Sequence, residues 1–356
     1  MITQRLLVDQ NDITKTRVHR LPQRALEEGE ARLVLETCAL TANNVTYAAV
    51  GFTTGYWKFF PTGMEGQGLV PVWGVAEVAE SRADALPQGT RLYGFYPLAE
   101  ELIITPQADG HGMIVDAAPH RADLPAVYNR YAPVKRGPTE QEHLRALLQP
   151  LLATSYLLFD WLVDHEMFGA EQIVIGSASS KTGLGLCKFL AEPTDRAYRI
   201  VGLTSSANRD FVTGLNACDE VLDYDQIEQI KQVPSVFVDM AGNGATKSAL
   251  HRHLGDNLKH SAAVGMSHWD KFEPGQQLAG PKPQFFFAPA QIAKRREEWG
   301  PGAIEARITE SWKRIAQSAD QWLTIKEHQG IKSAAAVFDT LSQGRANPRD
   351  GHVIRM

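Results

Sequence analysis

Short apolar runs and helical stripes alternate along the middle of the chain. Residues 173–175 read Ile-Val-Ile, a run typical of a buried strand. Small residues follow it, and apolar side chains then recur at helical spacing from Leu184 to Leu190. The pattern predicts a strand, a tight turn and a helix within residues 172–191.

The same alternation continues toward the C-terminus. Strands are predicted in four further segments, 197–206, 219–224, 235–243 and 257–266. Helical patterns at 207–215 and 244–254 lie between some of them. Strands that alternate with helices predict a parallel sheet covered on both faces, which binds ligands at the C-terminal ends of its strands.

Residues 1–130 have a different pattern. Their short alternating or apolar runs, broken by glycine and proline, predict a β-rich region. Within it, residues 41–61 place several aromatic side chains in a Gly- and Thr-rich context that predicts a loop. These aromatic side chains either cap a core or line a pocket.

The second half of the chain completes the outline. A helical pattern covers residues 139–169, and Pro150 is expected to break it into two pieces. Residues 267–292 read as a long Gly- and Pro-rich connection, and further helices precede a strand-like end at 351–356. We expect the β-rich start and this end to form one domain, into which the α/β unit is inserted.

Composition narrows the class of protein. The 356 residues suggest about two domains, and a net charge of -5 does not favour nucleic-acid binding. No run of 18 apolar residues and no signal-peptide pattern is found, so we expect a cytoplasmic protein without a membrane span. Cys38, Cys187 and Cys218 are far apart in sequence, which favours neither disulfides nor a structural zinc site.

The turn after residues 173–175 is the strongest candidate for binding chemistry. A helix that begins just after a parallel strand places its positive dipole end where a phosphate binds. Gly176, Gly183 and Gly185 give the spacing G-x6-G-x-G rather than G-x-G-x-x-G, and serines stand where glycines are usual. Two alternatives remain: a decayed P-loop ending at Lys181-Thr182, and a turn whose small residues serve only packing.

The next strand end bears on the choice of dinucleotide. NAD sites usually place Asp or Glu there to hold the ribose 2′-hydroxyl. Here Thr204, Ser205 and Ser206 are followed by Arg209, and no acid comes before Asp210. Hydroxyls and a cation suit a 2′-phosphate, so the sequence favours NADP over NAD.

Several segments together resemble the medium-chain dehydrogenase/reductase superfamily, in particular its zinc-free quinone oxidoreductase-like branch. The segment LLATSYLLFDWL is similar to the family's L-x-x-T-A-Y, and IVIGSASSKTGLG to its first β-α turn. LNACDEVLDY is similar to L-G-A-D-E-V-I-D-Y, and VFVDMAG contains D-x-x-G. The closing AAAVFDTLSQGRANPRDGHVIRM also resembles the family's last helix and strand.

The resemblance implies a fold. It predicts a Rossmann-type doubly wound parallel sheet, plus a β-rich GroES-like domain formed by the N-terminal part and the C-terminal end. The substrate domain is expected at 1–135, the cofactor domain with connecting helices at 136–325, and the return to the substrate domain at 326–356. Relatives often pair through the edge of the cofactor-domain sheet, so a homodimer is expected.

The resemblance also implies a cofactor site for NADP(H). The pyrophosphate is expected over Ser179, Ser180, Lys181, Thr182 and Gly183. The 2′-phosphate is expected near Ser205, Ser206, Arg209 and Tyr224, with Lys181 as a further candidate. The nicotinamide is expected near Gly242, Gly265, Met266, Asn44 and Thr154.

Zinc catalysis does not fit the sequence. The family's metal-using members have a C-x-x-C-H and a later G-H-E, but here Thr41 stands at the ligand cysteine. Val72 and Trp73 replace the histidine and the acid. A catalytic zinc needs three protein ligands, so no metal is predicted.

The remaining chemistry is hydride transfer from NADPH to an enone, quinone or related small-molecule acceptor. The acceptor oxygen then needs a hydrogen-bond donor, and Tyr47 and Tyr56 are the candidates for that role. Two alternatives stay open: a sensor that binds NADP(H) without turnover, and an accessory protein whose cofactor cleft has lost its function.

Overall fold

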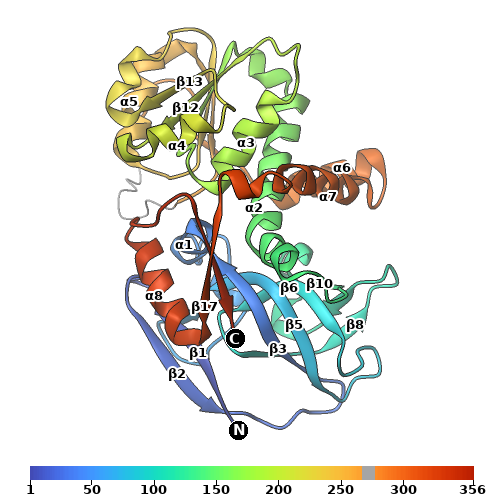
Figure 1. Ribbon diagram of the computed structural model, residues 1–356. Coiled ribbons are helices and arrows are strands. Elements are labelled where there is room, and N and C mark those ends of the chain that lie inside the picture. The colour runs from blue at the N-terminus through green and yellow to red at the C-terminus, as the bar shows by residue number, and fades with distance from the viewer. Residues whose placement is uncertain (267–276) are drawn as a thin grey trace. The chain divides into compact units, whose positions relative to one another are not determined.

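A computed structural model describes residues 1–266 and 277–356 of the chain (Figure 1). The chain divides into two compact units. The first comprises Met1–Leu147 together with Thr324–Met356, and the second comprises Leu148–Leu323. The two ends of the chain therefore belong to the same unit.

The first unit contains a small and a large sheet. In the three-stranded sheet, β1 (Ile2–Asp9) lies between β2 (Thr16–Pro22) and β4 (Gln67–Leu69). The nine-stranded sheet runs β17-β18-β3-β5-β6-β10-β9-β8, and β7 also pairs with β3. Its strands are β3 (Ala31–Leu40), β5 (Pro71–Ser81), β6 (Arg91–Pro97), β7 (Glu101–Ile104), β8 (Pro106–Ala108), β9 (Ile114–Asp116), β10 (Arg130–Pro133), β17 (Thr324–Gln329) and β18 (Asp350–Arg355).

The C-terminal strand joins the N-terminal half of the chain. Strand β18 pairs antiparallel with β3, so that Ile354 lies opposite Cys38. Helix α8 (Gly330–Ser342) contacts β1 and β2. This pairing buries Val353 and Ile354 in the core of the first unit.

Part of the expected aromatic loop is a helix. Residues Ala42–Ala49 form α1, which Thr41 caps by accepting a hydrogen bond from the Asn43 amide. The prediction of a loop over 42–49 is therefore wrong, because the Thr41–Asn44 capping pair starts a helix that apolar spacing alone did not reveal. A short 3-10 turn, Tyr56–Lys58, follows it.

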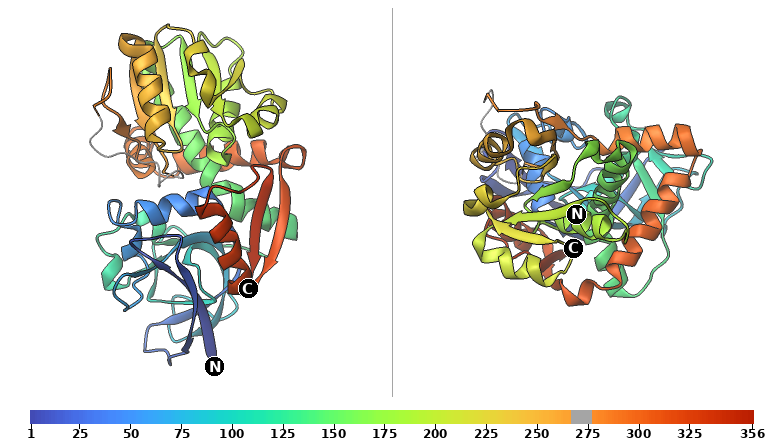
Figure 2. Two further views of the ribbon diagram at one scale, coloured as in Figure 1. Left: turned by 90° about the vertical axis from the view of Figure 1, so that its left-hand side faces the viewer. Right: turned by 90° about the horizontal axis from the view of Figure 1, so that it is seen from above.

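The second unit is built on a six-stranded parallel sheet in the order β13-β12-β11-β14-β15-β16. The strand order reverses at β11, from which β12 and β14 lie on either side. Right-handed crossovers on the two sides of such a switch point place the intervening helices on opposite faces, as α3 and α5 lie in Figures 1 and 2. The strands are β11 (Gln172–Gly176), β12 (Arg199–Thr204), β13 (Glu220–Asp223), β14 (Ser235–Asp239), β15 (Leu258–Ala263) and β16 (Gln284–Phe285), and the first helices are α3 (Lys181–Ala191), α4 (Arg209–Gly214) and α5 (Gly244–Leu254).

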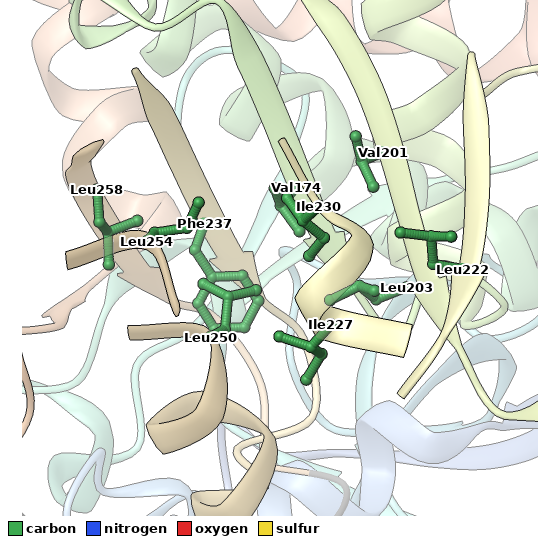
Figure 3. Close-up of a cluster of buried hydrophobic side chains, with 10 residues drawn as sticks. All are labelled: Val174, Val201, Leu203, Leu222, Ile227, Ile230, Phe237, Leu250, Leu254 and Leu258. Carbon is green, nitrogen blue, oxygen red and sulfur yellow. The ribbon is translucent and has the colours of Figure 1, made fainter. Parts of the chain in front are cut away.

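One face of this sheet packs a continuous apolar cluster. Figure 3 shows side chains of β11, β12, β13, β14 and β15 meeting those of α5 and of the 3-10 turn Tyr224–Gln229. Phe237 and Leu250 are almost completely buried at its centre. The members are Val174, Val201, Leu203, Leu222, Ile227, Ile230, Phe237, Leu250, Leu254 and Leu258. This burial fixes the strands whose C-terminal ends carry the candidate site.

Helix α2 (Thr139–Asp164) is continuous through Pro150, so the predicted break is wrong. Thr154 Oγ1 donates to the Pro150 carbonyl across 3.1 Å, and Ser155 Oγ lies 3.0 Å from the Leu151 carbonyl. These bonds and the burial of the apolar side hold the helix together around the proline. By length and composition α2 is able to cross a membrane, but about half of its apolar window is buried, as in core helices.

The segment expected as a connection contains secondary structure. Residues 267–276 of that segment lie outside the described residues, and Gln284–Phe285 form β16. Helices α6 (Ala288–Trp299) and α7 (Ala303–Ala316) follow. The interpretation of 284–292 as a connection is wrong, because β16 completes its hydrogen bonding only by pairing with β15, which local sequence does not reveal.

Candidate functional site

The turn between β11 and α3 has the geometry that its sequence predicts. Ser180 is the N-cap of α3, and its Oγ accepts from the Gly183 amide across 3.1 Å. A Cβ added to Gly183 would lie 2.5 Å from the Ser177 carbonyl oxygen, so the turn closes only over a glycine. Ser177 has φ 56°, the left-handed conformation in which glycine is usual. The turn therefore keeps a tight left-handed form with serine in place of glycine.

Ser179 links this turn to the next strand end. Its Oγ accepts from Thr204 Oγ1 across 3.0 Å and from Asn208 Nδ2 across 3.4 Å. The side chain is almost completely buried. A hydroxyl that accepts two hydrogen bonds still has its own proton to donate, so Ser179 is able to serve a phosphate oxygen.

Tyr224 lies against the same turn. Its phenol forms hydrogen bonds with the side chain and the backbone of Ser177. Burial raises the pKa of Tyr224 to about 12, and the bonds from Ser177 oppose that shift. The structure thus brings Tyr224 to the β11–α3 turn, and its predicted contact with the 2′-phosphate stays a prediction.

Arg209 lies near Asp223, a residue that the sequence pattern did not predict as its neighbour. Its Nη1 lies 4.0 Å from Asp223 Oδ2, and Asp223 is the register partner of Thr204 across β12 and β13. Asp223 also accepts from the Asp225 amide as the N-cap of the following 3-10 turn. Ser205 and Ser206 follow Thr204 at the start of a short 3-10 turn. This edge therefore carries hydroxyls, one cation and one carboxylate.

The backbone segments that follow β14 and β15 approach each other closely. Asp239 Oδ1 accepts from the Ala241 and Gly242 amides at 3.0 and 2.9 Å, so Asp239 shapes the turn after β14. Burial raises the pKa of the Asp239 carboxyl, and these amides oppose the rise. Gly242 has φ 74°, and a Cβ there would lie 3.0 Å from Met266 Cγ.

A Cβ added to Gly265 would overlap the Met240 carbonyl. The structure thus brings the predicted nicotinamide residues Gly242, Gly265 and Met266 together, and their contact with a nicotinamide stays a prediction.

Helix α3 also packs closely on α2. A Cβ added to Gly185 would lie 2.5 Å from Ser155 Oγ, and that hydroxyl lies 2.8 Å from the Thr182 carbonyl. Thr154 uses its hydroxyl within α2. The predicted cofactor contacts of Lys181, Thr182 and Thr154 stay predictions.

The first unit contains a cluster of aromatic rings, called here the aromatic cluster. Tyr47 and Tyr56 have ring centroids 4.5 Å apart, and Phe95 lies 5.6 Å from Tyr47 and 5.5 Å from Phe59. Its members are Tyr47, Tyr56, Phe59, Phe60, Trp73, Phe95 and Tyr128. The aromatic side chains thus form a core whose hydroxyls come from only three residues.

The predicted proton donors are both in this cluster. Trp73 Nε1 donates to the Tyr47 hydroxyl across 3.3 Å, and the Tyr56 and Tyr128 hydroxyls are 3.0 Å apart. Burial raises the pKa of all three phenols, so they are neutral donors near pH 7. Sequence reasoning missed Tyr128, because it lies far along the chain and no local motif marks it.

Asn44 has a structural role that accounts for its burial. Its Oδ1 accepts from the Thr41 amide across 2.7 Å, and its Nδ2 donates to the Pro71 carbonyl across 2.8 Å. These bonds start α1 and tie it to β5. The predicted approach of Asn44 to a nicotinamide stays a prediction.

The residues at the family's metal positions have no ligand set. Cys38 is buried in β3, and burial raises the pKa of its thiol well above the usual range. Within residues 1–266 and 277–356, no group of three or more His, Cys, Asp or Glu side chains is placed to hold a metal ion.

Comparison with solved structures shows the fold. CurA from Vibrio vulnificus, solved in complex with NADPH, is 13% identical, covers 99% of both chains and has a TM-score of 0.64. An enoyl thioester reductase mutant from Candida tropicalis is 12% identical over 100% of both chains, with a TM-score of 0.57. The quinone oxidoreductase from Coxiella burnetii is 13% identical over 100% of both chains, with a TM-score of 0.52. The predicted fold of the medium-chain dehydrogenase/reductase superfamily is therefore confirmed.

Sequence comparison gives a narrower assignment. No curated protein matches the chain. One family model matches residues 38–347, which is most of the chain. The chain therefore belongs to the family described as "Protein of unknown function (DUF2855)", and it has the medium-chain dehydrogenase/reductase fold.

Proposed function

We propose that this protein is an NADPH-dependent oxidoreductase that reduces an enone, quinone or related carbonyl compound without a metal. One observation carries the proposal: the ends of β11, β12 and β13 bring a helix N-terminus, buried hydroxyls and a cation to one edge of a parallel sheet. That combination suits a phosphorylated dinucleotide. CurA, which has the same fold, was solved with NADPH.

The residues present fit the cofactor. Gly183 lets the turn approach the start of α3, where a Cβ would collide with the Ser177 carbonyl. Ser179 has a hydroxyl proton to donate, and Arg209 is half-exposed and only loosely paired with Asp223. Ser179, Ser180, Lys181, Thr182 and Gly183 would hold the pyrophosphate, and Ser205, Ser206, Arg209 and Tyr224 the 2′-phosphate.

When bound, NADPH supplies a hydride to an electron-poor carbon of the acceptor. The chain must then stabilise the negative charge that develops on the acceptor oxygen. Tyr56 and Tyr128 are neutral donors 3.0 Å apart, so one is able to donate to the oxygen while the other donates to its partner. Tyr47, held by Trp73, is the second candidate donor.

The chemistry of the side chains supports the proposed zinc independence. Val72 and Trp73 offer no atom that ligates zinc, and Thr41 uses its Oγ1 to cap α1. The acceptor oxygen is therefore proposed to depend on hydroxyl donors for its stabilisation.

We also propose a homodimer that forms through the edge of the parallel sheet, and a cytoplasmic location. Strand β16 is an edge strand that pairs with β15. Phe285 and Phe287 lie there with 56% and 38% of their surfaces exposed. An exposed apolar edge is a usual site of pairing between chains. Three free cysteines fit a reducing compartment.

Cofactor binding tests the proposal. Arg209→Gln should raise the Kd for NADPH by about tenfold, since a charge-assisted hydrogen bond contributes roughly 1.5–3 kcal/mol and Arg209 is partly solvated. The Kd for NADH should change less than twofold. The matched control is Arg199→Gln at the amino end of β12, where Arg199 also pairs with an acid, Glu220, at 3.3 Å.

Titration calorimetry gives the affinities, and loss of absorbance at 340 nm with enones and quinones gives turnover. Equal losses for both cofactors would contradict the 2′-phosphate site. NADPH binding without turnover on any acceptor would favour a sensor over an enzyme.

A further inference from the structure

Two arginines and a histidine gather on one face of the three-stranded sheet in the first unit. Arg5 on β1 lies directly opposite His19 on β2, and Arg17 lies opposite Leu7. Residues 5 and 7 share a face, as do 17 and 19, because side chains alternate along a strand. Arg5 Nε donates to His19 Nδ1 across 3.2 Å. The three side chains therefore form one cluster, called here the cationic cluster.

The cluster is built around a fixed loop. Arg5 Nη2 donates to the Thr62 carbonyl at 3.1 Å, and it also lies 3.9 Å from Met64 Sδ. Arg17 Nη2 lies 3.9 Å from the same sulfur. Thr62 Oγ1 holds the loop by accepting from the Met64 amide and bonding the Gln67 carbonyl. The arginines are thus positioned by neutral partners.

The cluster is not paired with an acid in the part of the chain that the structure describes. Within residues 1–266 and 277–356, no ion pair between a carboxylate and Arg5, Arg17 or His19 is found. The charges instead act on each other: burial and then Arg17 lower the pKa of Arg5, and burial, Arg5 and Arg17 lower that of His19. Like charges held together without an acid are unfavourable, and a bound anion relieves the repulsion.

The spacing suits one oxyanion. Arg5 Nη2 and Arg17 Nη2 each lie 3.9 Å from the same sulfur, so they are at most about 8 Å apart, and each guanidinium group has further N–H donors. A phosphate or carboxylate spans such a distance with two charge-assisted hydrogen bonds. Because His19 Nδ1 accepts from Arg5, the ring proton is on Nε2, which gives a third donor.

The cluster adjoins the aromatic cluster. Met64, which both arginines contact, packs against the aromatic cluster. Leu7, the cross-strand partner of Arg17, is a buried member of the same packing group. An anion held by the arginines is therefore separated by one side chain, Met64, from the aromatic cluster assigned to the acceptor.

We propose that Arg5, Arg17 and His19 bind an oxyanion, such as a phosphate, carboxylate or sulfonate group, that is part of the acceptor substrate. The acceptor is then an anionic carbonyl compound rather than a neutral one. The identity of the ligand rests on the proposed reductase function, whereas the anion site itself does not.

The site is tested without turnover by NMR of the His19 ring. Addition of inorganic phosphate should raise the pKa of His19 by about half a unit or more, because a bound anion favours the imidazolium. Sodium chloride at equal ionic strength serves as the control for screening, and a His19→Asn spectrum assigns the signal. Arg17→Gln should abolish the response to phosphate. Arg20→Gln, an exposed arginine on the opposite face of β2, should keep it.

The link to the acceptor is tested with a matched pair of quinones. The ratio of kcat/KM for 1,2-naphthoquinone-4-sulfonate over 1,2-naphthoquinone should fall about tenfold in Arg17→Gln, through KM, and stay unchanged in Arg20→Gln. An unchanged ratio in Arg17→Gln would overturn the assignment to the substrate. No phosphate response beyond that of chloride would overturn the anion site. Failure to oxidise NADPH with either quinone, while phosphate still shifts His19, would count against the proposed function instead.

Discussion

The carboxyl ends and the amino ends of the strands in the six-stranded sheet are called here the carboxyl edge and the amino edge. Non-glycine residues with positive φ lie next to both, but their surroundings differ. At the carboxyl edge, Ser177 has φ 56° in the turn that leads into α3. Before the amino end of β11, Glu166, Met167 and Phe168 have φ values of 50°, 51° and 53° in one left-handed turn. Each such residue costs on the order of 1–2 kcal/mol, so both edges contain strained backbone.

The amino edge offsets this strain with ring stacking. Phe168 lies between His165 and His260, with centroids 4.9 and 4.1 Å away and both rings tilted by only 13°. Trp161 contacts Phe168 and His260 and also Phe286. The rings close this edge by packing against one another.

The carboxyl edge uses polar groups instead. Ser177 bonds Tyr224, and Ser179 connects Thr204 and Asn208 while keeping a proton to donate. Left-handed backbone thus occurs at both edges, in an apolar stack at one and among polar groups at the other. The difference lies in whether the groups around the turn are apolar and stacked or polar with donors remaining.

The largest expected effect concerns the carboxyl edge. Gly183→Ala should raise the Kd for NADPH by about 100-fold, because the new Cβ displaces the Ser177 carbonyl and several charge-assisted bonds of roughly 1.5–3 kcal/mol are lost. The control is Gly214→Ala on α4, where a Cβ meets nothing within 4 Å. Calorimetry gives the affinities and circular dichroism checks the fold. A folded Gly183→Ala protein with normal affinity would break the comparison.

The amino edge should respond in stability and not in binding. Phe168→Ala removes both stacks of a half-buried ring and should lower the free energy of unfolding by about 2–3 kcal/mol. Phe52→Ala, whose ring is 65% exposed, should change it by less than about 0.5 kcal/mol. Urea denaturation measures both values. A weakened NADPH affinity in folded Phe168→Ala would mean that the two edges are coupled.

The amino edge also predicts a pH dependence. Burial, with a smaller contribution from His165, lowers the pKa of His260 to about 4, so the ring is neutral in the folded protein at pH 6. The unfolded chain takes up this proton near pH 6.5, and stability therefore falls as the pH drops from about 6.5 to 4. We expect this histidine to account for about 2 kcal/mol of that fall.

His260→Phe keeps a ring against Phe168 but does not titrate, so it should flatten the profile in this window. Denaturation midpoints measured between pH 7 and 4 test the prediction. Parallel profiles for the two proteins would contradict it.

The sequence predicted the parts of the fold that depend on local pattern. The β11–turn–α3 unit and helix α5 were found because apolar spacing and small residues specify them directly. Pro150 led to the wrong prediction of a helix break. The free-energy cost of a proline inside α2 is offset by packing of the buried side of the helix, which the local sequence does not reveal. Strand β16 was missed for a related reason: two exposed residues become a strand only through pairing with β15.

For the candidate site, too, the sequence predicted the features that depend on local pattern and missed those that depend on tertiary contacts. Residues next to a strand end, such as Ser179 and Gly242, were placed correctly at the carboxyl edge because topology fixes their position. Tyr128 and Asp223 come close to Tyr56 and Arg209 through tertiary contacts, and no spacing rule connects them. Asn44 was found from its sequence motif, but the structure also gives its side-chain amide a role in capping α1 that the motif did not predict.

The smallest expected effect concerns Ser177, a serine at a position where glycine is usual. Ser177→Gly relieves left-handed strain of about 1 kcal/mol but loses a side-chain hydrogen bond with Tyr224 of similar value, so stability should change by less than about 0.5 kcal/mol. Tyr224→Phe alone should cost about 1 kcal/mol. In the double mutant the two changes should be non-additive by about 1 kcal/mol, as expected for residues in one hydrogen bond. Additive losses would mean that the bond does not compensate the strain. The turn would then hold its shape through Ser180 and Gly183 alone, and the serine at position 177 would have to be explained by the ligand that the turn binds.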